Sequence, residues 1–167
     1  GSEMCIRDSA GGYEAVMVPS AGANVVKLKH TVTGIEILRT PDAEEMENFK
    51  ERPQIYGLPL LFPPNRIADG TYTFEGRKYQ YPITIPAQNN YHHGIIKSEP
   101  FTVSRTVEGK DFVEIEAVYY SNLFNNAIFR DFPHEFCCHM IFRLDVDGLH
   151  QTTVSVSYTH LTLPTKR

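Results

Sequence analysis

Two short stretches of this chain carry side chains suited to binding a small polar molecule. The first, PPNRI at residues 63–67, presents Asn65 and Arg66 directly after a pair of prolines. The second, QNNYHHG at residues 88–94, places two histidines immediately before a glycine. A guanidinium offers a fork of donors that suits neighbouring hydroxyl groups or a carboxylate, and a neutral histidine can donate or accept a hydrogen bond.

The two adjacent histidines are expected to have different roles, because neighbouring side chains of an extended chain point to opposite faces. Asn89 and Asn90 favour turns, and Gly94 allows the backbone to approach another group closely. Taken singly, Arg66 is typical of a surface arginine, and a histidine in such a loop is typical of a structural or solvent-facing one. Each motif alone is therefore weak evidence for a site.

The chain as a whole has the composition of one ordinary globular domain. It has 167 residues, 41% of them hydrophobic, with 16 Lys+Arg against 20 Asp+Glu and a net charge of -4. A mildly acidic chain without a basic cluster argues against nucleic acid as a partner. The longest apolar runs, GLPLLF and FCCHMIF, are too short to cross a bilayer, and three cysteines make no disulfide framework. We expect a soluble cytoplasmic protein with neither a membrane nor a nucleic-acid partner.

The two ends of the chain read differently from the middle. GSEMCIRDS at residues 1–9 has no clear hydrophobic period, and VSYTHLTLPTKR at residues 156–167 resembles a strand that breaks off abruptly. Both resemble translated sequencing-adapter sequence. We therefore expect residues 10–155 to be a native but partial β-sandwich domain and both terminal segments to be non-native.

The middle of the chain reads as strands separated by glycine turns. Strands are predicted in YEAVMVP, ANVVKLKH, TGIEILRT and YGLPLLF, the last ending at the prolines, and one short helix or loop in PDAEEMENFKERP. Three further hairpins are predicted, with turns at Glu75–Gly76, Glu108–Gly109 and Asp147–Gly148. Strands recurring at this spacing predict an all-β fold, an antiparallel β-sandwich.

A cluster rich in histidine and cysteine is not expected to bind a metal. The segment His134–His139 contains two histidines and two cysteines, but adjacent cysteines in a strand point to opposite faces. No C-x-x-C spacing is present, and a buried cysteine is a common core residue. No metal site is predicted.

Taken together, the two motifs resemble those of the aldose 1-epimerase (galactose mutarotase) family. PLLFPPNRIADGTYTFEGRKYQYP followed by NNYHHG is similar to the family pattern, in which NRI precedes a β-hairpin and N-x-x-H-G follows it. The resemblance extends from Tyr13 to Ser155, more weakly towards the C-terminal side. It implies a galactose mutarotase-like supersandwich whose concave sheet holds an aldose, present here as an incomplete N-terminal half.

The resemblance also implies roles for individual residues. Arg66 matches the family's substrate-binding arginine, and His93 matches its first active-site histidine, which binds substrate and takes part in catalysis. Asn65 and Asn90 are assigned to substrate binding beside them, Asn90 also shaping the loop, and His92 is assigned a packing role. The aromatic side chains of the hairpin, which could stack on a sugar, are expected to pack on one another.

The reaction implied is the interconversion of the α and β anomers of a free hexose of the galactose or glucose type, without a cofactor. A base removes the C1 hydroxyl proton, an acid protonates the ring oxygen, and the ring opens and closes again. In the family these groups are a glutamate and a second histidine later in the chain. His160 lacks the family context, so the chain by itself is expected to be inactive. The alternative is a non-catalytic β-sandwich that binds a sugar or sugar phosphate.

Overall fold

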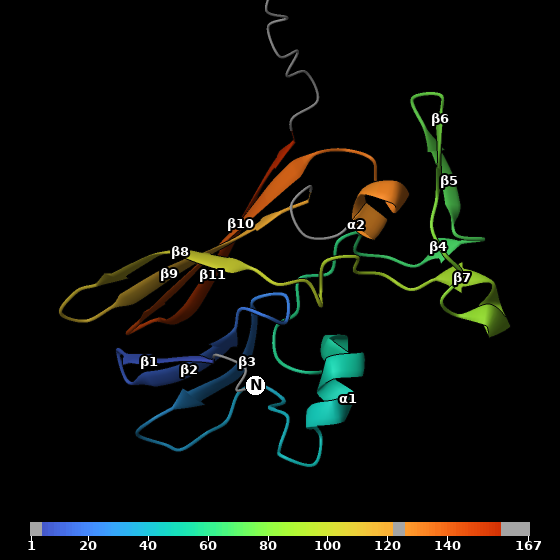
Figure 1. The fold of residues 1–167 in the computed structure, drawn as a ribbon. Helices are drawn as coiled ribbons and strands as arrows, with labels where there is room; N and C mark the ends of the chain where they lie inside the picture. The colour runs from blue at the N-terminus through green and yellow to red at the C-terminus, as the bar shows by residue number, and fades with distance from the viewer. Residues whose placement is uncertain (1–4, 122–125, 158–167) are drawn as a thin grey trace, which may run out of the picture.

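The structure is a computed structural model that describes residues 5–121 and 126–157. Two antiparallel sheets form its body and lie one above the other in Figure 1. The first has the order β1-β2-β3, with β1 (Ile6–Ala10), β2 (Tyr13–Val18) and β3 (Asn24–His30). The second has the order β11-β10-β9-β8, with β8 (Thr102–Glu108), β9 (Val113–Tyr120), β10 (Phe136–Asp145) and β11 (Gly148–Ser157). The predicted all-β antiparallel class is confirmed.

The main core lies between the two sheets and follows from the alternation of side chains along the strands. On β10 the residues Cys138, Met140, Phe142 and Leu144 share one face and are all buried. They pack with residues of the three-stranded sheet in one hydrophobic cluster, and Met140 is 0% exposed. The cysteines of the His134–His139 segment are thus both buried in a strand, as expected.

The opposite face of the first sheet is covered by a short helix. Helix α1 (Met46–Glu51) lies within the acidic segment in which one short helix or loop was predicted, and the 3-10 turn η1 (Pro53–Ile55) begins at the end of that segment. Phe49 of α1 and Tyr56 are 1% exposed and pack on β2 and β3 through a second hydrophobic cluster. None of the helices in the described residues is both long and apolar enough to span a membrane.

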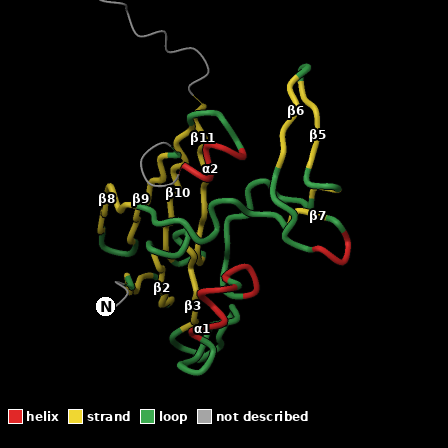
Figure 2. The backbone as a smooth tube through the Cα atoms, turned by 45° about the vertical axis from the view of Figure 1, so that its right-hand side comes forward, coloured by secondary structure: helices red, strands yellow, loops and turns green. Residues whose placement is uncertain are grey.

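A long connection between the sheets carries small elements away from the sandwich, as Figures 1 and 2 show. It contains β4 (Ile67–Ala68), the hairpin β5 (Thr71–Phe74) and β6 (Arg77–Gln80), the turn η2 (Pro86–Gln88) and β7 (Asn90–Tyr91). The predicted hairpin turn is present, with positive φ at Glu75 (48°) and Gly76 (77°), as a type I′ turn requires. Helix α2 (Asn126–Asp131) lies between β9 and β10.

Two predicted strands are absent from the structure. TGIEILRT and YGLPLLF meet β3 at isolated bridges, Lys29 with Glu36 and Val25 with Leu58, and neither segment extends its bridge into a ladder. Pro59 within the second segment lacks the N–H that a strand donates to its ladder. In the first segment Ile35 and Ile37 are 59% and 52% exposed, and Leu38 is the residue that packs against the main core, so the segment buries little apolar surface that would hold a strand in place.

The predicted limits of the native domain fall inside regular strands. β1 pairs with β2 in the register Ile6 with Met17, and β11 continues to Ser157. Residues 1–4 and 158–167, including His160, lie outside the described residues. The native extent of residues 10–155 stays a prediction.

Candidate active site

The two motifs are held side by side by backbone hydrogen bonds. The Gly94 N–H donates to the Pro63 carbonyl over 3.1 Å, and the Ile95 N–H donates to the Phe62 carbonyl over 2.7 Å. A few residues further along, β4 pairs with β7 through Ile67 with Tyr91. The segment that ends in Arg66 therefore lies next to the segment that carries the histidines.

Gly94 is required at the crossing of these two segments. Its φ is +92°, which side chains other than glycine rarely adopt, and an added Cβ would lie 3.0 Å from Lys97 Cδ and 3.1 Å from Leu61 Cδ2. The Lys97 amine folds back across the glycine and donates to the His93 carbonyl over 2.9 Å. This turn fixes the backbone on both sides of the histidine pair.

An open pocket of about 560 Å³ lies between the α1–η1 segment, the histidine loop and α2. Its size is in the usual range for small-molecule sites, about 300–1,000 Å³. Among the described residues, its lining consists of Glu51, Arg52, Gln54, Arg66, Pro82, Thr84, Ile85, Tyr91, His92, Gly94, Ile95, Lys97, Ile128 and Asp131. The structure thus brings Arg66 and the histidine loop to one cavity.

The two histidines pack against each other, with 4.2 Å between ring centroids and 36° between ring planes. His92 lines the pocket, and its backbone N–H donates to Thr84 Oγ1 over 2.6 Å. His93 Nδ1 is buried and has no hydrogen-bond partner within the described residues. His92, which was expected to have a packing role, therefore lies at the pocket wall. His93, which was expected to be catalytic, lies against the His92 ring.

Burial and neighbouring cations keep both rings neutral. The pKa of His93 is lowered from its ordinary value by burial first, then by the positive charges of Lys97 and Arg66. The pKa of His92 is lowered by burial first and then by His93 and the same cations, with Arg52 adding to them. Near pH 7 each ring can therefore exchange a proton with a bound molecule rather than hold a fixed charge.

The other predicted site residues take different positions. The exposed Arg66 guanidinium donates to Gln88 Oε1 over 3.0 Å, and Asn65 beside it is exposed. The Asn90 amide nitrogen can donate to the carbonyls of Gln88 and Asn89 at 3.2 and 3.3 Å, which fits the loop-shaping role. Asn65, Asn90 and His93 do not line this pocket, so their contact with substrate stays a prediction.

Sequence reasoning missed Lys97 and Arg52, which line the same pocket. Lys97 stands three residues after Gly94, and the geometry of the turn at this glycine decides whether its side chain reaches the pocket. Arg52 lies in the acidic segment, and only the packing of α1 brings it to the histidines. For Arg52 no signal in the sequence pointed to this placement.

The hairpin aromatics largely pack on one another, as expected. Tyr72 and Tyr79 are stacked, with 4.8 Å between centroids, and Tyr79 and Tyr81 are buried. The Tyr79 hydroxyl lies 2.7 Å from His134 Nε2. His134 is thus engaged with the hairpin.

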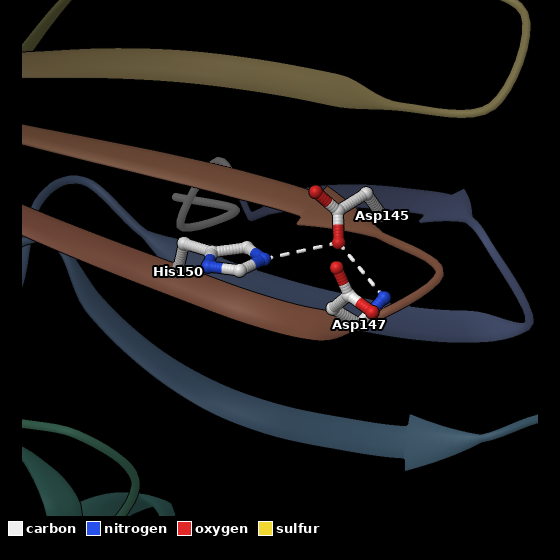
Figure 3. Close-up of side chains that lie close together, drawn as sticks. All are labelled: Asp145, Asp147 and His150. Atoms are coloured by element: carbon white, nitrogen blue, oxygen red, sulfur yellow. Dashed lines mark hydrogen bonds and ion pairs between the residues drawn. The ribbon is translucent and has the colours of Figure 1, made fainter.

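One further group of potential ligands lies at the turn between β10 and β11 (Figure 3). Asp145 Oδ1 accepts hydrogen bonds from His150 Nε2 (3.0 Å) and from the Asp147 N–H (2.9 Å), and Oδ2 accepts one from Arg143 Nε (3.1 Å). The carboxylate is therefore already satisfied by protein donors, and the cluster serves the turn.

The fold and the pocket together define a galactose mutarotase-like β-sandwich with a basic and histidine-containing cavity on its connecting loops. The model of the aldose 1-epimerase family matches residues 4–164. The chain therefore belongs to the aldose 1-epimerase family.

Individual relatives agree with this assignment. A galactose mutarotase-like protein from Clostridium acetobutylicum has a solved structure with a TM-score of 0.87 and 46% identity, over 92% of this chain and 45% of that chain. Galactose 1-epimerase from Lactobacillus acidophilus shares the fold, with a TM-score of 0.70 and 17% identity over 90% of this chain and 42% of that chain. The uncharacterized protein YihR of Escherichia coli is 32% identical over 97 residues, 58% of this chain and 29% of YihR. The chain thus spans less than half the length of these relatives.

Proposed function

We propose that this chain is the N-terminal half of an aldose 1-epimerase that interconverts the α and β anomers of a free hexose. The observation that carries the proposal is the joining of the two motifs, which places Arg66 and His92 at one pocket, with the His93 ring packed against His92. Neither motif alone distinguishes a site from an ordinary surface loop. Their contact through the glycine turn supports a site built for one ligand.

In this proposal Arg66 and the histidines divide the work. The fork of Arg66 donors orients neighbouring hydroxyl groups of the sugar, and its exposed position leaves it free to do so. His93, kept neutral by burial, donates a hydrogen bond towards the ring oxygen, where negative charge develops as the ring opens. Its buried Nδ1, which has no partner within the described residues, can accept a hydrogen bond from the ligand or from the rest of the protein.

The general base and acid are proposed to lie outside this chain. Within the described residues, the carboxylates that line the pocket are Glu51 and Asp131, and neither belongs to a motif of the family. The chain alone is therefore expected to bind a hexose weakly and to leave the spontaneous rate of mutarotation unchanged. The complete protein is expected to work without a cofactor.

The test is polarimetry of freshly dissolved α-galactose and α-glucose with the complete protein and with this chain. The complete protein should accelerate the change in rotation, and His93→Gln should lower its kcat by about 100-fold, the usual effect of removing one hydrogen-bond donor that stabilises charge in the transition state. His92→Gln, its matched neighbour, should change KM more than kcat. A complete protein that binds hexose without accelerating mutarotation would establish the non-catalytic binding alternative instead.

A further inference from the structure

Basic side chains gather on one side of the pocket. Arg52, Arg66 and Lys97 line it, and all three lower the pKa of His92 through their charges. Lys97 and Arg66 also lower the pKa of His93 through their charges. A neutral hexose offers no counter-charge to such a cluster.

Lys97 is the most unusual member of this group. Burial lowers the pKa of its amine, and the hydrogen bond that its Nζ makes is to the His93 carbonyl. Within the described residues no carboxylate lies within ion-pair distance of it. Lys27, a similarly half-buried lysine on β3, has Glu14 at 3.3 Å and Glu36 at 3.7 Å. Burying a charged amine without a counter-ion costs free energy of folding. Its position at a pocket wall therefore points to a ligand that supplies the negative charge.

Within the described residues, the acidic side chains of the pocket form no ion pair with this cluster. Asp131 on α2 is paired with Arg130, with 3.2 Å between Nε and Oδ1. Glu51 is exposed at the end of α1 and forms no ion pair within the described residues. Within the described residues, none of Arg52, Arg66 and Lys97 forms an ion pair, so a ligand can supply their counter-charge.

We propose that Lys97, together with Arg52, holds the anionic group of an aldose that carries a phosphate or a carboxylate. The inference rests on the proposed function, because it names the class of aldose that the same pocket accepts. An ammonium group binds a phosphate or carboxylate as a compact point charge through charge-assisted hydrogen bonds. Arg66 and the histidines then remain available for the hydroxyl groups and the ring.

The experiment is a titration of the isotope-labelled 167-residue chain, followed by nuclear magnetic resonance of the imidazoles and the lysine ε-carbons. The four probes are glucose 6-phosphate, galacturonate, glucose and inorganic phosphate. We expect saturable shifts of Lys97 and His92, with one of the anionic sugars binding at least about tenfold more tightly than glucose, a difference of about 1.4 kcal/mol. The comparison of phosphate with carboxylate identifies which anion the pocket prefers.

Matched variants separate a specific contact from general attraction. Lys97→Met keeps the apolar stem and should remove the preference for the anionic sugar, and Lys97→Arg should largely retain it. Lys27→Met removes an equal charge outside the pocket and should change nothing in the titration. Thermal unfolding of each variant establishes that it is folded.

Four results would overturn the proposal. Equal binding of glucose and the anionic sugars refutes the charge preference but leaves the proposed function standing. Unchanged preference in Lys97→Met refutes the role of this residue. Shifts with inorganic phosphate but with no sugar contradict sugar binding itself, and with it both proposals; absence of any response to the anionic sugars also overturns the inference.

Discussion

Charged residues on the four-stranded sheet and in the pocket are of the same types but are partnered differently. On the sheet, Arg143 lies 3.1 Å from Asp145 and 3.9 Å from Glu114, and its guanidinium lies 4.0 Å above the Phe112 ring. In the pocket, Arg66 donates to an uncharged amide and Lys97 to a backbone carbonyl. Arg143 on the sheet is thus matched by carboxylates, whereas Arg66 and Lys97 in the pocket form no ion pair within the described residues.

Backbone geometry explains the difference. Arg143 and Glu114 are register partners on β10 and β9, so the antiparallel ladder itself places opposite charges next to each other. The pocket is built from loops and helix ends, which supply no such fixed neighbour. An unmatched charge there raises the free energy of the folded protein, and we interpret it as retained for ligand binding.

The largest expected effect lies in the core below the paired charges. Met140→Ala should lower the free energy of unfolding by about 2–5 kcal/mol, because this fully buried side chain would leave a cavity between the sheets. Urea unfolding measures the change, and Met140→Leu, which conserves volume, is the control and should cost less than about 1.5 kcal/mol. A loss below about 1 kcal/mol for the alanine variant would show that this part of the sandwich is loosely packed.

A smaller effect is expected at the hairpin turn of Figure 3. The hydrogen bond from His150, then that from the Asp147 N–H, holds the pKa of Asp145 below its ordinary value, and Arg143 adds to this. A carboxyl with a lowered folded pKa contributes stability above its unfolded pKa, about 3.9, and loses it as the pH falls through the folded value. Asp145→Asn should therefore lower the thermal midpoint at pH 7 and match the wild type at pH 2. A difference that persists at pH 2 would contradict the ionic origin of the effect.

Removing a charge from the pocket should not lower stability, in contrast to removing Asp145 from the hairpin turn. Lys97→Met removes a half-buried charge that has no counter-ion in the described residues, so stability should be unchanged or slightly higher. Lys27→Met removes a charge that is paired with Glu14, and stability should be slightly lower. Thermal unfolding of the two variants at low salt checks this. A clear loss of stability in Lys97→Met would show that its hydrogen bond to the His93 carbonyl is structural.

The smallest effect concerns pH. Because the folded pKa values of His92 and His93 lie below the unfolded value of about 6.5, the unfolded chain binds more protons and stability falls as the pH drops below that value. The double variant His92→Gln, His93→Gln should lose less stability than the wild type between pH 7 and pH 5. Equal losses in both proteins would mean that these rings are not held neutral by the fold.

The sequence predicts the sandwich well because its strands follow elementary rules. Alternating residues in FCCHMIFRLD and glycine turns such as Glu75–Gly76 specify local structure that the fold confirms. It overpredicts strands in YGLPLLF, where Pro59 interrupts the ladder, and in TGIEILRT, where the sequence does not show that Ile35 and Ile37 stay exposed. In these two segments, apolar residues alone do not distinguish a strand from a loop.

The site could be predicted only in part. The motifs lead to Arg66 and the histidine loop, which the structure brings to one pocket. The contributions of Arg52 and Lys97 depend on how α1 and the glycine turn pack, which no local pattern encodes. The order of the two rings at the pocket wall depends on side-chain packing in the same way.

The most direct test of the contrast between sheet and pocket is a matched pair of arginine variants in the complete protein. For Arg66→Ala and Arg143→Ala, kcat/KM for mutarotation and the thermal midpoint are measured together. We predict that Arg66→Ala loses about 100-fold in kcat/KM with an unchanged midpoint. Arg143→Ala should lower the midpoint and keep kcat/KM within about twofold, because its partners are structural. Equal activity of the two variants, or a loss of activity confined to Arg143→Ala, would contradict the assignment of the pocket as the functional site.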